Sequence, residues 1–363
     1  MDITVGFIGL GLIGGSIAKS LKKADSSIYT IAYNRSPEPL RQAVEEGVID
    51  ESAFSIDDSF RKCDIIFLCT PVEYNSIYLS EISKHIKDDC ILTDVGSVKG
   101  YIHNTVKELK LEHCFIGGHP MAGSEKTGYA AASDILLENA YYAITPTEST
   151  DKASLDFYVS LVKKTGAIPI VVEPDIHDYA VAGISHVPHL IASSLVNMVR
   201  ENDTDDELMK LLAAGGFKDI TRIASSSPEM WSQICVTNPT QISVILQKYI
   251  DILSRVKDYV DNSDRDAIHE MFAESREYRN SISITTKGPV LSSYAIFCEI
   301  EDKEGALNSF TSLLSASHIN IRNFEIIHNR EYKDGALRID FYDEHSAHKA
   351  FEILCNNGYT VYR

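Results

Sequence analysis

One histidine follows a predicted strand directly, a position at which parallel-sheet proteins often place reactive groups. The apolar run 115–117 predicts that strand, and His119 comes after it in a loop rich in proline and glycine. Polar residues at the carboxyl ends of such strands gather along one edge of the sheet. Because a neutral imidazole accepts protons near pH 7, we expect His119 to take a proton from a substrate hydroxyl. Ser97, after the strand predicted at 91–95, is either a second hydrogen-bond partner or a helix N-cap.

Two further histidines lie three residues apart in a predicted helix. Ser185, His186 and His189 fall within one turn, and Pro188 removes a backbone donor and kinks the helix locally. The pair lacks the glutamate or cysteine companions of a zinc site, so no metal is expected. One of these polar side chains is predicted to hydrogen-bond a substrate, although their order does not say which.

Residues 215–224 supply positive charge. Lys218 and Arg222 are four apart, so they share one face of a predicted helix. The apolar neighbours of Arg222, with Trp231 further on, predict a partly buried guanidinium that needs an anionic partner. An arginine binds a carboxylate through two parallel hydrogen bonds. That carboxylate belongs either to the protein itself or to a substrate.

A glycine-rich turn connects the first predicted strand to a helix. The string is Gly9-Leu10-Gly11-Leu12-Ile13-Gly14, and a second strand follows about 20 residues later. Gly9 permits the tight turn, Gly11 lets a pyrophosphate approach the backbone, and Gly14 allows close packing of helix on strand. Free N–H groups at the helix start, near Leu12 and Ile13, attract the anion. The pattern predicts a dinucleotide site.

The end of the second strand bears on the choice between nicotinamide cofactors. NAD sites usually carry Asp or Glu there, whereas NADP sites lack it and offer Arg. This chain has Asn34 and Arg35, and neither would repel a 2′-phosphate. Both cofactors stay open on these residues, since Arg35 can also lie in solvent. Thr70 and Pro71 follow a further strand and complete the predicted cofactor site.

Short apolar runs alternate with helical patterns throughout residues 1–172. Continuously apolar strands separated by helices predict an α/β, Rossmann-like domain with a mostly parallel, doubly wound sheet. The predicted strands are 3–8, 28–33, 65–69, 91–95, 115–117, 142–144 and 168–172. The predicted helices are 13–22, 40–47, 74–86, 98–109 and 152–164.

Residues 173–283 carry helical patterns throughout and predict an all-α second domain. Its helices are expected at 178–200, 205–212, 217–225, 228–236, 239–260 and 263–281. The helix 239–260 has a wide apolar stripe that needs a partner surface, and a second copy of the chain would supply one in a homodimer. After a linker at 284–293, residues 294–363 give βαββαβ, a ferredoxin-like arrangement.

Charge and cysteine content exclude several classes of protein. The 363 residues include 34 basic and 52 acidic side chains, and the net charge of −18 repels nucleic acid and anionic membranes. Seven cysteines without a C-x-x-C pair indicate buried thiols in a reducing compartment. No leader is visible, and the most apolar stretch, 179–199, contains two histidines and a proline. We expect a cytoplasmic protein that binds a small molecule, with no nucleic-acid or membrane partner.

Five strings, taken in order, resemble the prephenate dehydrogenase family. They are 9–14, 94–99, 119–128, 185–189 and 217–224 with Trp231. Residues 294–363 resemble an ACT regulatory domain, although Glu304 stands where that family usually has proline. The resemblance implies oxidative decarboxylation of prephenate to 4-hydroxyphenylpyruvate in tyrosine biosynthesis, with NAD+ as the usual acceptor and feedback inhibition by tyrosine.

The resemblance also assigns roles to individual residues. It places His119 at the ring hydroxyl, Ser97 between that hydroxyl and the nicotinamide, and Arg222 at a substrate carboxylate. Other expected substrate-pocket residues are Ser124, Glu125, Ser185, His189 and Lys218. The expected effector site in the ACT-like domain comprises Gly305, Ala306, Leu307 and Asn320.

Other interpretations stay open. Arogenate dehydrogenase acts on the amino analogue, and Glu125 could accept hydrogen bonds from its ammonium group. β-Hydroxyacid dehydrogenases share the Rossmann start but depend on a catalytic lysine in the helical domain, and the histidine strings fit this chain better. A non-catalytic sensor of dinucleotide and amino acid would not need His119 and Arg222 in complementary positions. Asn34 and Arg35 depart from an acidic pattern, so NADP+ stays an alternative to NAD+.

Overall fold

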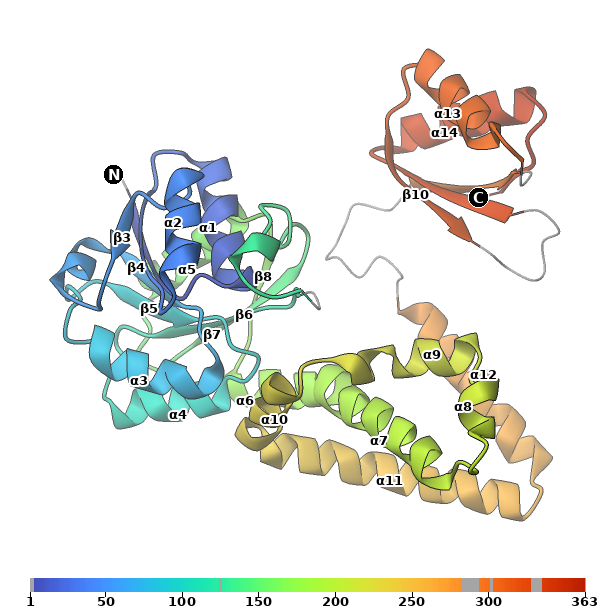
Figure 1. Ribbon diagram of the computed structural model, residues 1–363, viewed down its shortest axis with the longest axis horizontal. Helices are drawn as coiled ribbons and strands as arrows, with labels where there is room; N and C mark the ends of the chain where they lie inside the picture. Colours follow the sequence, from blue (N-terminus) through green and yellow to red (C-terminus); the bar gives the residue numbers. More distant parts are fainter. Residues whose placement is uncertain (1–2, 124–125, 283–293, 301–302, 328–334, 363) are drawn as a thin grey trace. The chain divides into compact units, whose positions relative to one another are not determined.

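The computed structural model describes residues 3–123, 126–282, 294–300, 303–327 and 335–362. The chain forms two compact units, Met1–Gly288 and Pro289–Arg363, each considered by itself (Figure 1). The larger unit combines an α/β part with a helical part, and the smaller unit contains one antiparallel sheet. This is the fold class predicted from the sequence. The predicted linker, 284–293, lies outside the described residues, as do Ser124 and Glu125.

Five parallel strands form the first sheet, in the order β3-β2-β1-β4-β5. They are β1 Thr4–Ile8, β2 Tyr29–Tyr33, β3 Glu51–Ala53, β4 Ile65–Leu68 and β5 Ile91–Asp94. Because β1 pairs with β2 on one side and with β4 on the other, the strand order reverses there, and doubly wound sheets bind ligands at that point. The sequence does not predict β3, a three-residue edge strand with no apolar run.

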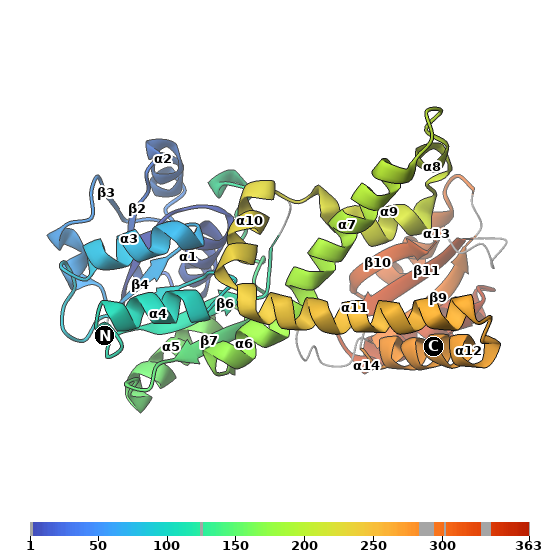
Figure 2. The ribbon, with the colours of Figure 1, turned by 90° about the horizontal axis from the view of Figure 1, so that it is seen from below.

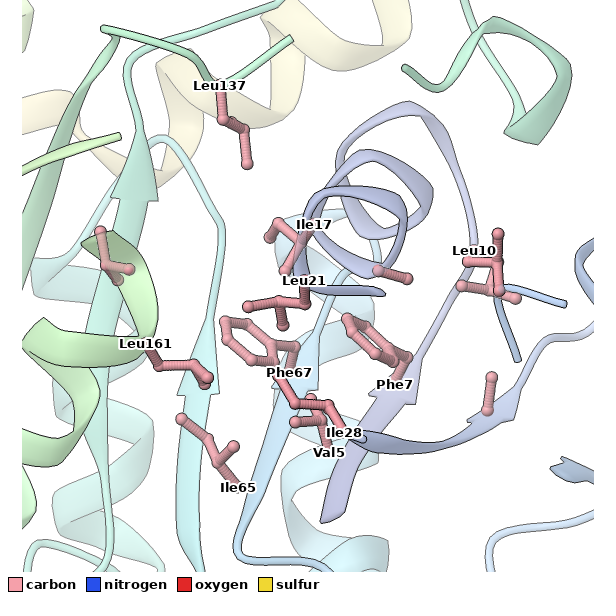
Figure 3. Packing of buried hydrophobic residues seen from close by; sticks show 14 of the residues in the cluster. Val5, Phe7, Leu10, Ile17, Leu21, Ile28, Ile65, Phe67, Leu137 and Leu161 are labelled. Atoms are coloured by element: carbon pink, nitrogen blue, oxygen red, sulfur yellow. The ribbon is translucent and has the colours of Figure 1, made fainter. Parts of the chain in front are cut away.

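Helices cover both faces of this sheet (Figure 1). They are α1 Leu12–Ala24, α2 Pro37–Glu45, α3 Val72–Ile82, α4 Gly100–Glu108 and α5 Lys152–Lys164. On the face covered by α1 and α5, the rings of Phe7 and Phe67 stack 5.5 Å apart and pack with Leu21 (Figure 3). On the other face, Ile82 and Ile102 belong to a second core under α3 and α4. Burial on both faces explains why the strands are continuously apolar.

A second sheet of three strands extends the α/β part. The strands are β6 Ile116–Pro120, β7 Tyr141–Pro146 and β8 Ile168–Val171, and β6 runs antiparallel to β7. A parallel bridge between Leu92 and Phe115 connects the start of β6 to β5.

Strand β6 continues further than predicted, so His119 lies inside the strand, opposite Ala143, and not in the loop that follows. Two glycines concealed this extension because glycine is uncommon in strands. Gly118 is required here, since a Cβ would lie 2.3 Å from the Tyr158 hydroxyl.

One continuous run of helix carries the predicted histidines. It consists of α6 Pro174–Val181, the π-helical segment η3 Ala182–His186 and α7 Val187–Asn202. Pro188 has no N–H and lies in the first turn of α7, directly after this π-helical segment. In the π-helical segment, the N–H of Val187 donates to the carbonyl of Ala182, five residues back.

The same run is long and apolar enough, by composition, to cross a membrane, with a mean hydropathy of 1.2 over 18 residues. However, it buries His177, Asp178 and His186, and all three have hydrogen-bond partners inside the unit. These three side chains lie in the first half of the run, and 28% of its 18-residue apolar window is buried within the described chain.

The remaining helices of the larger unit pack against α7 or against the long helix α11. They are α8 Leu208–Leu212, α9 Gly215–Thr221, the 3₁₀ segment η4 Arg222–Ser225, α10 Pro228–Thr237, α11 Pro239–Asp261 and α12 Arg265–Ser281. Figure 2 shows α11 as one long helix that begins beside α6 and α10. Ile242 near its start is buried with Ala182 and Val187, whereas Ile252, Leu253 and Val260 are exposed in the single chain.

The C-terminal unit is a four-stranded antiparallel sheet with two helices. Its elements are β9 Tyr294–Ile300, α13 Ala306–Ala316, β10 Ile321–Ile327, β11 Gly335–Phe341, α14 Glu344–Asn356 and β12 Val361–Tyr362, and the strand order is β10-β11-β9-β12. The helices bury Phe310 and Leu354 against Ile296 and Leu337. This confirms the predicted βαββαβ arrangement and gives the unit a core of its own.

Candidate active site

The glycine turn between β1 and α1 leaves room for a pyrophosphate. Gly9 has a φ of +100°, which favours glycine, and a Cβ on Gly14 would lie 2.5 Å from the carbonyl oxygen of Gly9. A Cβ on Gly11, in contrast, would meet nothing within 4 Å. Since Gly11 is the N-cap of α1, no side chain caps the helix, and its first amides can bind an anion. The residues therefore fit the dinucleotide that the motif implies.

A pocket of about 270 Å³ opens beside this turn. Of the predicted cofactor residues, it is lined by Gly9, Gly11, Asn34, Arg35, Thr70 and Pro71. Leu12, Ile13 and Gly14 form the adjoining first turn of α1, whereas Ser97 is not in the pocket wall. Tyr33 and Tyr78, which the sequence did not single out, add aromatic surface, with ring centroids 6.2 Å apart.

Asn34 supports the glycine turn with both ends of its amide. Its Oδ1 accepts a hydrogen bond from the Leu10 N–H at 2.9 Å, and its Nδ2 donates to the Ser36 carbonyl at 2.8 Å. A carboxylate at this position could accept the first bond but could not donate the second. The Asn34 side chain thus shapes the pocket, and the exposed Arg35 contributes positive charge to its wall.

His119 is hydrogen-bonded to another histidine across the boundary between the α/β and helical parts. Its Nδ1 lies 2.8 Å from Nε2 of His177 on α6, and Nδ1 of His177 lies 2.8 Å from Oδ1 of Asp178. The His119 ring is partly exposed, and the His177 and Asp178 side chains are buried. Burial, with the nearby His177, Lys99 and His186, holds the pKa of His119 well below its usual value. The imidazole is therefore neutral, as a proton acceptor must be.

Asp178 also closes the N-terminus of α4. Its Oδ1 accepts the backbone N–H of Lys99 at 2.8 Å, and its Oδ2 accepts that of Gly100 at 2.7 Å. Burial opposes ionisation, but the hydrogen bonds from His177 and these two amides outweigh it and lower the pKa of Asp178. A carboxylate of the helical part thus caps a helix of the α/β part.

A buried ion pair fixes the strand that carries His119. The Lys99 Nζ, fully buried, binds Asp94 Oδ2 and donates to the Gly118 carbonyl at 2.7 Å. Burial lowers the pKa of Lys99, although Asp94 counteracts this. The Lys99–Asp94 pair joins the end of β5 to β6 one residue before His119.

The second histidine cluster lies against Trp231. The rings of His189 and Trp231 are stacked, with centroids 3.5 Å apart and planes at 23°. His189 Nδ1 lies 2.9 Å from the Ser185 carbonyl, so Nδ1 carries the proton and Nε2 can accept a hydrogen bond. His186 is buried and bonds Asn238, whose Nδ2 lies 3.3 Å from its Nδ1.

Charges connect the two histidine clusters. Burial lowers the pKa of His186 to about 4, with smaller contributions from His177 and His189. Burial and the nearby Arg222 lower the pKa of His189. His186 in turn contributes to the lowered pKa of His119.

Two predictions about this region are wrong. Arg222 is exposed instead of partly buried, because the apolar Ile220 beside it is itself 64% exposed. The α-helix that carries Lys218 ends at Thr221, so Arg222 begins a 3₁₀ segment and does not share an α-helical face with Lys218. The N-cap alternative for Ser97 is also excluded, since α4 begins at Gly100 and is capped by Asp178.

His177, Asp178 and Lys99 were not predicted from the sequence. A signal was available, since His177 and Asp178 are adjacent titratable residues at the start of a long apolar helix. Lys99 lies in the string 94–99, but a lysine beside a predicted helix start is usually a solvent-exposed residue. Among the described residues, no group of three or more His, Cys, Asp or Glu side chains could hold a metal ion.

Of the predicted effector residues, Gly305, Ala306 and Leu307 lie at the start of α13 in the C-terminal unit, whereas Asn320 lies just before β10. Gly305, with a φ of +84°, is the N-cap, and Ala306 and Leu307 begin the helix. A pocket of about 390 Å³ adjoins this helix start and is lined by Ala306, but not by Gly305, Leu307 or the exposed Asn320.

A dinucleotide pocket at the switch point of a parallel sheet, with a neutral, partly exposed histidine at the edge of the neighbouring sheet, defines a nicotinamide-dependent dehydrogenase. Comparisons with known proteins identify the family of dehydrogenases to which the chain belongs. The model of the prephenate dehydrogenase nucleotide-binding domain matches residues 17–171, and that of the prephenate dehydrogenase dimerization domain matches residues 173–274. The chain belongs to the prephenate dehydrogenase family, as the motifs indicated.

Individual relatives agree with this assignment. The prephenate dehydrogenase of Bacillus subtilis is 36% identical over 98% of this chain and 96% of its own length. Aquifex aeolicus prephenate dehydrogenase, solved with hydroxyphenyl propionate and NAD+, has a TM-score of 0.73 and 32% identity over 78% of this chain and 99% of that one. Synechocystis arogenate dehydrogenase has a TM-score of 0.70 and 32% identity over 77% of this chain and 99% of that one.

Proposed function

We propose that this enzyme oxidises and decarboxylates prephenate to 4-hydroxyphenylpyruvate in tyrosine biosynthesis, with His119 as the base. The observation that carries the proposal is the hydrogen bond between His119 Nδ1 and His177 Nε2, which leaves His119 Nε2 available to a substrate hydroxyl. A bound nicotinamide supplies the acceptor for the hydride that leaves the hydroxyl-bearing carbon. His119 takes the hydroxyl proton in that step.

Loss of carbon dioxide then supplies the electron pair that aromatises the ring, and His119 returns its proton to the phenolate oxygen. One prephenate and one oxidised cofactor give one 4-hydroxyphenylpyruvate, one carbon dioxide and one reduced cofactor. Aromatisation drives the reaction forward. The base therefore only has to take one proton from the substrate hydroxyl and return it to the phenolate oxygen of the product.

The remaining residues are proposed to bind the substrate. Arg222 binds a carboxylate, which explains a cationic group in a chain of net charge −18. His189 offers Nε2 to a substrate donor, and Ser97 adds a hydroxyl at the end of β5. Further pocket positions proposed from the family match are Ser124, Glu125 and Ser185, and Lys218 is proposed from its positive charge near Arg222.

We propose NAD+ as the main acceptor and NADP+ as a second one. The Aquifex aeolicus relative holds NAD+, which supports the first. The absence of a carboxylate at Asn34 and the exposed guanidinium of Arg35 in the pocket wall support the second. An NADP+ 2′-phosphate would meet a positive charge there.

The proposed enzyme is a cytoplasmic homodimer regulated by tyrosine. The match to a dimerization domain and the exposed Ile252, Leu253 and Val260 of α11 support self-association. The βαββαβ unit supports binding of an amino-acid effector near Gly305. Light scattering on the purified chain would give the mass of a dimer, and a monomer would contradict it.

The decisive experiment follows absorbance at 340 nm with each pairing of prephenate or arogenate with NAD+ or NADP+. We expect prephenate with NAD+ to give the highest kcat/KM, and 4-hydroxyphenylpyruvate as the product. Higher kcat/KM with arogenate would instead support the second candidate, favoured by the similarity to the Synechocystis enzyme. No reduced cofactor with any pairing would overturn the proposal and leave a non-catalytic sensor.

A further inference from the structure

We propose that His177, held by Asp178, is a positioning residue that fixes the proton of His119 on Nδ1 and turns Nε2 toward the substrate. The inference deepens the proposed function and rests on it, since His119 is the base only there. It concerns residues of the helical part, whereas His119 belongs to the α/β part.

The direction of each hydrogen bond follows from the acceptor at the end of the series. The Asp178 carboxylate is ionised and can only accept, so His177 Nδ1, 2.8 Å away, donates to it. The proposed arrangement places the single ring proton of His177 on Nδ1, so its Nε2 accepts. His119 Nδ1, 2.8 Å from that nitrogen, is therefore the donor. Nε2 of His119 is then the ring nitrogen that has a free lone pair and can accept a proton.

A free histidine exchanges between two neutral forms, and only one of them presents Nε2 as an acceptor. A neighbour that accepts from Nδ1 removes the other form and fixes the ring plane. The His119 and His177 rings lie with centroids 5.0 Å apart and planes at 76°, so the edge of one ring meets the other at a defined angle. His177 thus acts on the reaction through His119 and needs no contact with substrate.

Asp178 cannot easily turn away from His177. Its two side-chain oxygens also accept hydrogen bonds from the backbone N–H groups of Lys99 and Gly100. Its backbone carbonyl accepts a hydrogen bond from Asn238 Nδ2 at 3.0 Å. The carboxylate is thereby held by both parts of the unit. When His119 becomes positively charged, this fixed negative charge lies one imidazole away and stabilises the cation.

Two substitutions of His177 separate positioning from packing. In His177→Gln, the longer amide can place an oxygen near the original Nε2 and accept from His119. In His177→Asn, the shorter amide can still donate to Asp178 but does not reach His119. We expect kcat to fall roughly 10²–10³-fold in His177→Asn, with KM within about threefold, and less than about tenfold in His177→Gln.

A double substitution tests whether His177 acts through His119. In a His119→Asn background, His177→Asn should change kcat by less than about threefold, because the residue it positions is gone. A full additional loss there would mean that His177 supports the fold instead, and would overturn the proposal. His103→Gln is the matched control, since His103 is also partly buried but bonds Thr145 Oγ1 at 2.9 Å.

A measurement without substrate separates this inference from the proposed function. In ¹⁵N-histidine NMR of the resting full-length enzyme, the His119 signals, assigned by their loss in His119→Asn, should show a protonated Nδ1 and a bare Nε2. His177→Gln should keep this pattern, and His177→Asn should mix the two forms. A wild-type His119 protonated on Nε2, or unchanged kcat in His177→Asn while prephenate is still turned over, would overturn the inference and leave the proposed function standing.

Discussion

His189 lies flat against Trp231, with ring centroids 3.5 Å apart, and the indole thereby fixes the plane of the His189 ring. The indole Nε1 is buried and has no hydrogen-bond partner among the described residues. The stacking surface, and not the indole N–H, is therefore what the folded chain uses in the absence of substrate.

Trp231→Phe should consequently keep most of the stability, because it retains an aromatic face and removes an unsatisfied donor. Trp231→Ala should lower the free energy of unfolding by roughly 3–5 kcal/mol, as expected for truncating a large packed side chain. Urea unfolding followed by circular dichroism measures both. Equal losses in the two variants would mean that the N–H has a partner that matters for folding.

His119→Asn should lower kcat by roughly 10²–10⁴-fold with little change in KM, because the variant loses the base but not the substrate contacts. Steady-state assays at saturating cofactor provide the measurement. Turnover at the wild-type rate would refute the role of His119 as the base.

Arg222→Ala should chiefly raise KM for prephenate, since a carboxylate contact binds the ground and transition states alike. A suitable control is Arg200→Ala on α7, whose guanidinium is exposed beside Glu201. A loss confined to kcat in Arg222→Ala would contradict a simple binding role. A rise in KM of similar size for Arg200→Ala would mean that the loss of one positive charge, and not the loss of a specific contact, weakens prephenate binding.

Acid should destabilise the larger unit between about pH 6.5 and pH 4. Burial lowers the pKa of both His103 and His186 to about 4, whereas in the unfolded chain a histidine titrates near 6.5. In that window the unfolded state binds protons that the folded state does not, so the free energy of unfolding falls as the pH falls. His103→Gln should show a shallower pH dependence in urea titrations at about pH 7 and about pH 5, and an unchanged slope would contradict this cause.

A chain ending at Ser283 should keep dehydrogenase activity and lose inhibition by tyrosine. The basis is the division into two units, each with its own core, with the expected effector residues in the smaller one. Initial rates with increasing tyrosine, for both chains, give the answer. Inhibition that persists in the shortened chain would place tyrosine in the active site.

Most of the fold could be predicted from local patterns in the sequence. The strands of the parallel sheet are apolar over their whole length because both faces are covered, and this is visible in residues 65–68 alone. Strand β3 was not predicted because Glu51 and Ser52 lie at the sheet edge, where an apolar side chain is not needed. β6 was predicted too short because two glycines precede His119.

The site was harder to predict because its key contacts join residues far apart in the chain. The motif around Gly9 was sufficient for the cofactor pocket, since a turn is a local structure. The bond between His119 and His177 spans 58 residues, and nothing in either neighbourhood specifies it. The exposure of Arg222 likewise depends on which helices pack over it, which spacing along one helix does not determine.

The Asp178 carboxylate has a consequence for motion. It holds the first amides of α4 from the opposite side of the boundary between the sheet and the helices. Any hinge opening at that boundary would pivot at Asp178 or expose the Lys99 and Gly100 amides to solvent. The rate of deuterium uptake at those two amides would therefore report how often the boundary opens, with or without a ligand.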